Sequence, residues 1–84
     1  MKFKVLYFAS LRESLGKAEE LVEAPSGVSS VAALQRFLAE RGEGVPALAR
    51  GRNVRAAVNQ VMVKDDVAIA DGDEIAFFPP VTGG

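Results

Sequence analysis

The residues best suited to chemistry lie at the end of the chain, which reads FFPPVTGG over residues 77–84. The chain has no Cys and no His, so it offers no thiol nucleophile, no imidazole base and none of the usual zinc ligands. The reactive group that remains is the α-carboxylate of Gly84, which is ionised at neutral pH. Once it is activated, for example as an acyl adenylate, sulfur can attack it to give a thiocarboxylate, or an amine can attack it to give an amide.

The residues before this carboxylate suit a projecting tail. Pro79 and Pro80 fix φ and lack N–H donors, so a strand that ends at Phe78 cannot continue. The two final glycines carry no side chain that would block a narrow channel. Residues 79–84 can reach about 20 Å, at about 3.3–3.6 Å per residue, which is enough to enter a cleft in another protein. The sequence therefore predicts a folded domain over residues 1–78 and an extended, flexible C-terminal tail. The alternative is a frayed end without function.

The composition is that of one small globular domain. The chain has 84 residues, of which 49% are hydrophobic and 25% charged, the ordinary range for a folded protein. Ten basic and eleven acidic residues give a net charge of −1 without a basic block, so no nucleic-acid partner is expected. No apolar run approaches the roughly 20 residues of a membrane span, and the first residues lack a signal-peptide pattern. We therefore expect a cytoplasmic protein that binds neither nucleic acid nor a membrane.

Hydrophobic periodicity predicts one principal helix. Apolar side chains recur at helical spacing from Val31 to Leu38, after Ser29 or Ser30 as the capping residue, and Gly42 is expected to end the run. A shorter helix is expected from Ser10 to Gly16, with a capping box between Ser10 and Glu13. Strands are predicted over residues 2–9, 17–24, 54–60, 61–63 and 73–78.

The order of these elements indicates an α+β fold. Two strands, a helix and further strands in so short a chain are typical of a β-grasp, ubiquitin-like fold, with a mixed sheet of about four to five strands and one principal helix packed on one face. Residues 43–53 are expected to form a loop. The acids Asp65, Asp66, Asp71 and Asp73 are expected to serve turns rather than a metal site. The arginines between residues 50 and 55 are expected to lie in a solvated loop.

Side-chain alternation along the strands predicts an apolar surface on the face without the helix. Ile75 and Phe77 are expected to meet the helix, whereas Phe8, Met62 and Phe78 share their face of the strands with polar residues and so should face solvent. Their polar companions are Lys2, Lys4, Gln60, Lys64 and Glu74. If the first, fourth and last strands are neighbours, the three residues form one patch suited to a protein partner. The alternatives are a bulge that reverses the alternation, or a loop that covers them.

Three segments carry a resemblance to a known family: VLYFASLRE (residues 5–13), AAVNQ (56–60) and DGDEIAFFPPVTGG (71–84). They closely resemble the small subunit of molybdopterin synthase, a ubiquitin-like sulfur carrier of molybdenum-cofactor biosynthesis, and the similarity runs the whole length. The resemblance implies that an activating enzyme related to ubiquitin-activating enzymes adenylates Gly84 with ATP. The terminus then becomes a thiocarboxylate and enters the large subunit, where it supplies sulfur to convert precursor Z (cyclic pyranopterin monophosphate) to molybdopterin.

The same resemblance implies the partners and the site residues. The chain is not an enzyme on its own, because the catalytic pocket belongs to the large subunit of the heteromer. It binds no cofactor and no metal itself, and a donor such as a cysteine desulfurase or a rhodanese supplies the sulfur. Gly84, with Gly83, carries the chemistry. The partner-binding residues are Phe8, Arg12, Met62, Phe78, Pro79, Pro80, Val81 and Thr82.

Two other functions remain open on the residues alone. The activated terminus could serve thiamine synthesis, tRNA thiolation or attachment to protein lysines as a ubiquitin-like tag. Alternatively, the chain is a non-catalytic β-grasp module that binds a protein through its patch, in which case removal of Gly83 and Gly84 leaves its function intact.

Overall fold

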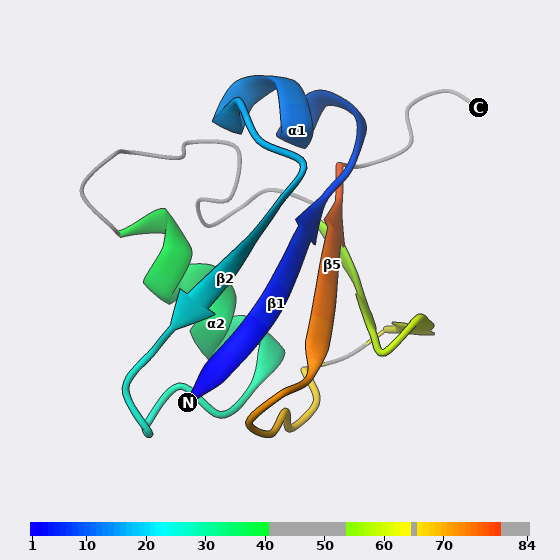
Figure 1. The fold of residues 1–84 in the computed structure, drawn as a ribbon. Helices are drawn as coiled ribbons and strands as arrows, with labels where there is room; N and C mark the ends of the chain where they lie inside the picture. Colours follow the sequence, from blue (N-terminus) through cyan, green and yellow to red (C-terminus); the bar gives the residue numbers. More distant parts are fainter. Residues whose placement is uncertain (41–53, 65, 80–84) are drawn as a thin grey trace.

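One mixed sheet organises the part of the chain that the computed structural model describes, residues 1–40, 54–64 and 66–79. The elements are β1 (Lys2–Tyr7), α1 (Ala9–Leu15), β2 (Glu19–Glu23), α2 (Val31–Ala39), β3 (Arg55–Val58), β4 (Val61–Val63) and β5 (Glu74–Phe78). The strands lie in the order β2-β1-β5-β3-β4; β1 and β5 pair in parallel and the other neighbours antiparallel. Figure 1 shows α2 across one face of the sheet and α1 at the end where β1 and β5 finish. The predicted α+β, β-grasp architecture is confirmed.

The core lies between the sheet and α2. Phe3, Val5 and Tyr7 of β1 are buried at every second position, and Val5 and Tyr7 lie beside the equally buried Ile75 and Phe77 of β5. From the helix, Val31, Leu34 and Leu38 complete the core. The apolar residues that recur at helical spacing in the sequence therefore lie on the side of α2 that faces the sheet. No helix in the described ranges is long and apolar enough to cross a membrane.

Two side chains hold the start of α2. Of the two predicted capping residues, Ser30 takes the role, and its Oγ accepts a hydrogen bond from the Ala33 N–H at 3.2 Å. Asp66 Oδ1 accepts from the Ala32 N–H at 2.8 Å, so a distant loop also stabilises this end. The helix ends at Ala39, and the predicted stop at Gly42 lies outside the described residues.

The start of α1 differs from the prediction. The helix begins at Ala9, Phe8 occupies the N-cap, and no side chain caps it; the predicted capping box at Ser10 is wrong because Ser10 lies inside the helix. The cause is a contact with β5, since the Phe8 N–H donates to the Phe77 carbonyl at 3.2 Å. The chain then turns at once through Ala9, whose φ is 53°. The predicted stop at Gly16 is confirmed, with φ 73° and its N–H donated to the Arg12 carbonyl.

The predicted strand over residues 54–60 is too long, because β3 ends at Val58. Asn59 and Gln60 have φ of 50° and 71° and join β3 to β4 in a tight hairpin, where positive φ at both central residues suits the twist of the strands. Asn59 is held there by Glu74: the Asn59 N–H donates to the Glu74 carbonyl at 2.7 Å, and Asn59 Oδ1 accepts from the Glu74 N–H at 3.0 Å.

The turn before β5 uses its acids as the sequence predicts. Asp73 Oδ2 accepts from the Ala70 N–H at 2.8 Å and Asp73 Oδ1 from the Asn59 side-chain amide at 3.1 Å. These hydrogen bonds, that of Ala70 first, lower the pKa of Asp73. Asp71 Oδ1 accepts from the Lys2 N–H at 2.6 Å, which ties the turn to β1. These carboxylates therefore serve the backbone.

Candidate functional site

An apolar row crosses the face of the sheet that α2 does not cover. In the strand registers, Leu6 of β1 lies beside Ala76 of β5, Ala76 beside Ala57 of β3, and Ala57 beside Met62 of β4. Together with Phe8 and Phe78 at the ends of β1 and β5, these side chains make up a surface that we call the apolar patch: Leu6, Phe8, Ala57, Met62, Ala76 and Phe78. The first, fourth and last strands therefore bring their outward-facing apolar residues to the same face, although the fourth is not a neighbour of the last, because β3 lies between β4 and β5.

Two stacked phenylalanines form the largest part of the apolar patch. The rings of Phe8 and Phe78 are parallel to within 8°, with their centroids 4.7 Å apart, a geometry in which aromatic pairs attract beyond their buried area. The hydrogen bond from Phe8 N–H to Phe77 fixes the backbone beneath the pair. Even when stacked, Phe8 is 41% exposed, and Met62 is 56% exposed. Exposed aromatic and methionine side chains that lie together in this way are typical of a protein-binding surface.

Two alanines form the floor of the patch. Ala57 and Ala76 are buried to 5% and 6% exposure, yet they stand apart from the core cluster on the helix side. Their cover therefore comes from larger side chains on the same face of the sheet.

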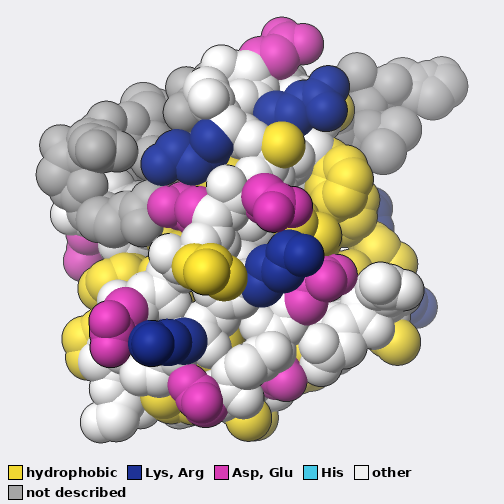
Figure 2. Space-filling model, in the orientation of Figure 1, with side chains coloured by type: hydrophobic (Ala, Val, Ile, Leu, Met, Phe, Trp, Pro, Cys, Tyr) yellow, Lys and Arg dark blue, Asp and Glu magenta, His cyan; other side chains and the backbone are white. Residues whose placement is uncertain are grey.

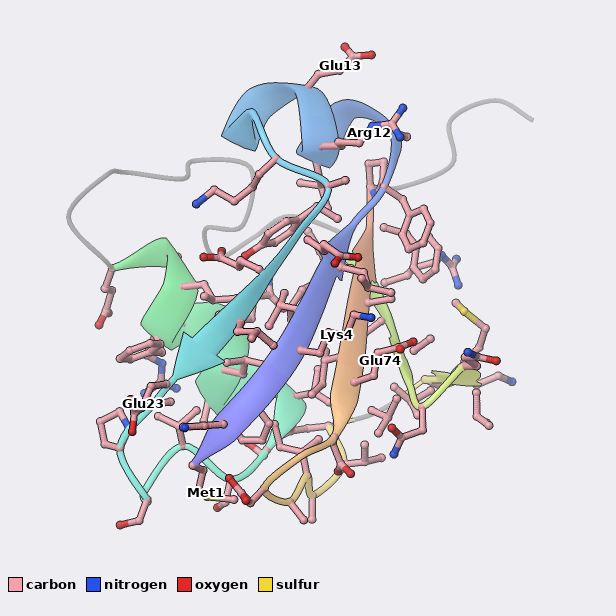
Figure 3. All side chains as sticks on the ribbon, in the orientation of Figure 1. Met1, Lys4, Arg12, Glu13, Glu23 and Glu74 are labelled. Atoms are coloured by element: carbon pink, nitrogen blue, oxygen red, sulfur yellow. The ribbon has the colours of Figure 1, made fainter. Side chains whose placement is uncertain are left out.

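The described part of the chain contains some of the predicted site residues. The alternation prediction is confirmed for Phe8, Met62 and Phe78, which lie on the sheet face opposite α2; their role in binding a partner stays a prediction. Arg12 is exposed on α1, and Figure 3 shows its side chain over the end of the sheet where β1 and β5 finish. Pro79 follows β5 directly and is half-buried. The remaining predicted residues, Pro80, Val81, Thr82, Gly83 and Gly84, lie outside the described residues.

Sequence reasoning missed four members or neighbours of this surface: Leu6, Ala57, Ala76 and Arg55. The signal for the first three was present, because Leu6 shares a strand face with Phe8 and Ala76 with Phe78, while Ala57 alternates with Ala56. Small or aliphatic residues, however, do not stand out as surface residues. Arg55 falls in the strand predicted over residues 54–60 but also among the arginines expected in a loop; it is the first residue of β3 and lies beside Phe78 in the register. Figure 2 shows hydrophobic side chains gathered near the ends of β1 and β5, with basic side chains at the border.

Comparisons with known proteins identify the family of the chain. The model of the ThiS family matches residues 5–84. The molybdopterin synthase sulfur carrier subunit of Escherichia coli is 41% identical over 96% of this chain and 98% of its own length. Among solved structures, a putative molybdopterin converting factor, subunit 1, from Pyrococcus furiosus has a TM-score of 0.74 at 33% identity and covers 96% of this chain and 99% of its own.

A third neighbour shares the fold at lower identity. SAMP1 of Haloferax volcanii, a small archaeal modifier protein, has a TM-score of 0.74 at 27% identity, with both chains covered over their whole length. The family match includes the C-terminal glycines, and the relatives match across the β-grasp domain from end to end. The chain therefore belongs to the ThiS family and is a relative of the molybdopterin synthase sulfur carrier subunits.

Proposed function

We propose that this protein carries sulfur for the synthesis of molybdopterin on its C-terminal carboxylate. The observation that supports this most directly is the match, 41% identical over 96% of the chain, to a protein named as the sulfur carrier subunit of molybdopterin synthase. The carboxylate of Gly84 attacks the α-phosphorus of ATP on an activating enzyme and releases pyrophosphate. A sulfide then attacks the carbonyl carbon and displaces AMP, which leaves a thiocarboxylate.

Delivery of the sulfur requires a second protein. The chain has no Cys and no His, so the acid–base groups and the nucleotide site of this chemistry belong to its partners. The apolar patch stands beside the last residue of β5, and docking it on the large subunit would direct residues 79–84 toward that subunit's active site. There the thiocarboxylate gives its sulfur to cyclic pyranopterin monophosphate, and water restores the carboxylate.

The fold and the terminus have separable roles in this proposal. Removal of Gly83 and Gly84 should abolish molybdopterin formation in a mixture of this protein, its large subunit, the activating enzyme, ATP, sulfide and cyclic pyranopterin monophosphate. The same truncated protein should still bind the large subunit within a few-fold of the intact affinity, because the apolar patch is unchanged. Molybdopterin formation by the truncated protein would overturn the proposal and favour a module that acts by binding alone.

A second candidate function is attachment of the activated terminus to lysine side chains. This function is favoured by the likeness to the modifier SAMP1, and it begins with the same adenylation step as the sulfur-carrier function. In cells that express this protein with its activating enzyme, mass spectrometry of lysine-linked Gly84 tests it: isopeptide-linked peptides support conjugation, whereas a terminus found only as carboxylate and thiocarboxylate rejects it. Use of the same thiocarboxylate for thiamine or tRNA would appear as sulfur transfer in mixtures that contain those acceptor systems.

A further inference from the structure

Arg55 extends the candidate surface beyond its apolar part. It begins β3 and lies opposite Phe78 in the antiparallel register, so its side chain projects from the face that carries the apolar patch. Its side chain is exposed and makes no hydrogen bond or ion pair with any described residue. An arginine therefore stands beside the last residue of the sheet, where the tail begins.

Two other basic side chains on this face, those of Lys2 and Lys4, differ, because each has an acid as its neighbour. In the register, Lys2 lies opposite Glu23 and Lys4 opposite Glu74. Opposite charges on neighbouring strands attract, and each reduces the electrostatic potential that the other projects. This part of the face is therefore balanced in charge, although it lies on the same sheet as Arg55.

Arg12 provides a second unbalanced cation at the same end of the sheet. It is exposed and has no acidic partner among the described residues. Figure 3 shows Arg12 over the end of β1 and β5, while the adjacent Glu13 points away from the sheet. The chain as a whole has a net charge of −1, so the positive charge at this end is a local feature rather than a general one.

We propose that Arg55 and Arg12 form a cationic rim that recognises carboxylate side chains around the apolar docking site of the partner protein. The inference rests on the proposed function and adds the chemistry of the partner: an apolar centre bordered by Asp or Glu on the side where the tail enters. Arginine suits this role because its planar guanidinium pairs with a carboxylate through two hydrogen bonds. A nucleic acid fits less well, because phosphates would meet the apolar patch and a chain of negative net charge.

Charges at the rim of an interface act mainly on the rate of association. They steer the encounter of the two proteins, and salt screens this attraction. The probe is the large subunit of molybdopterin synthase from the same organism, mixed with the full-length protein in a stopped-flow instrument from 20 to 500 mM NaCl. The test variant is R12Q/R55Q. The control, K2Q/K4Q, removes the same charge from the balanced part of the face, and R12K/R55K keeps the charge at the rim.

We expect R12Q/R55Q to lower the association rate constant about tenfold at 20 mM NaCl, and this difference from wild type should vanish toward 500 mM NaCl. The dissociation rate constant should stay within about threefold of wild type. K2Q/K4Q and R12K/R55K should stay within about threefold of wild type. Unchanged association of R12Q/R55Q, or an equal loss in K2Q/K4Q, would overturn the cationic rim while leaving the proposed function standing. If the wild-type protein does not bind the large subunit, both proposals are wrong.

Discussion

Phe8 and Phe78 stack face to face at 4.7 Å between ring centroids, although Phe8 follows the first strand and Phe78 ends the last. The parallel pairing of β1 and β5 at the centre of the sheet brings them together. The stack therefore joins the junction between β1 and α1 to the end of β5, where the C-terminal tail begins. A partner that binds the pair also binds at the root of the tail.

This position makes Phe78 the expected anchor of the protein interface. Phe78→Ala should weaken binding of the large subunit by about 2–4 kcal/mol, which is about 30- to 700-fold in Kd, because it removes one ring and exposes the other. Isothermal titration calorimetry measures the loss. Leu21→Ala is the matched control, since Leu21 is 82% exposed on β2 outside the apolar patch and its loss should leave Kd unchanged. Equal affinities for wild type and Phe78→Ala would contradict the assignment.

The hairpin between β3 and β4 should be improved by a glycine. Gln60 has φ 71°, a left-handed conformation that costs a residue with a Cβ about 1–2 kcal/mol, and Asn-Gly is the preferred pair for such a turn. We expect Gln60→Gly to raise the free energy of unfolding by about 0.5–1 kcal/mol, because relief of strain exceeds the added entropy of the unfolded chain. Urea denaturation measures this. Gln60→Ala should give no gain, and a loss of stability in the glycine variant would count against this turn geometry.

Asp73 should make folding stability depend on acid pH. The Ala70 N–H and the Asn59 amide lower its pKa in the folded state below the ordinary value of 3.8, so its contribution is present above that value and is lost as the pH falls through the folded pKa. Urea denaturation of wild type and Asp73→Asn at pH 5.5 and pH 2.5 checks this. We expect the wild type to be more stable at pH 5.5 and its advantage to shrink at pH 2.5. An advantage that is the same at both pH values would exclude the effect.

Local patterns predicted the sheet faces because strand alternation depends only on neighbouring residues. Ile75 and Phe77 point to the helix and Phe78 away from it, as their positions require. The capping of α2 by Ser30 is also local, since the hydroxyl reaches an N–H three residues ahead. The fold class followed from these elements because few arrangements bury one helical stripe against so short a set of strands.

The features that local sequence patterns did not predict depend on contacts between residues far apart in the chain. The Phe77 carbonyl fixes Phe8 and moves the start of α1 to Ala9, which no capping signal reveals. Glu74 holds Asn59 in a turn that contains no glycine. The burial of Ala57 and Ala76 depends on side chains from neighbouring strands, and an alanine gives the same signal on a surface as in a core. The chemistry of the terminus came from the absence of Cys and His together with the final glycines.

Transfer of sulfur to Gly84 is tested most directly by the intact mass of this protein after incubation with ATP, its activating enzyme and sulfide. The mass should rise by about 16 Da, the replacement of one oxygen by sulfur, and fragmentation should locate the change on Gly84. The protein lacking Gly83 and Gly84 should show no gain. An unchanged mass for the intact protein, with an activating enzyme shown to charge another carrier in the same assay, would contradict the claim that this terminus carries sulfur.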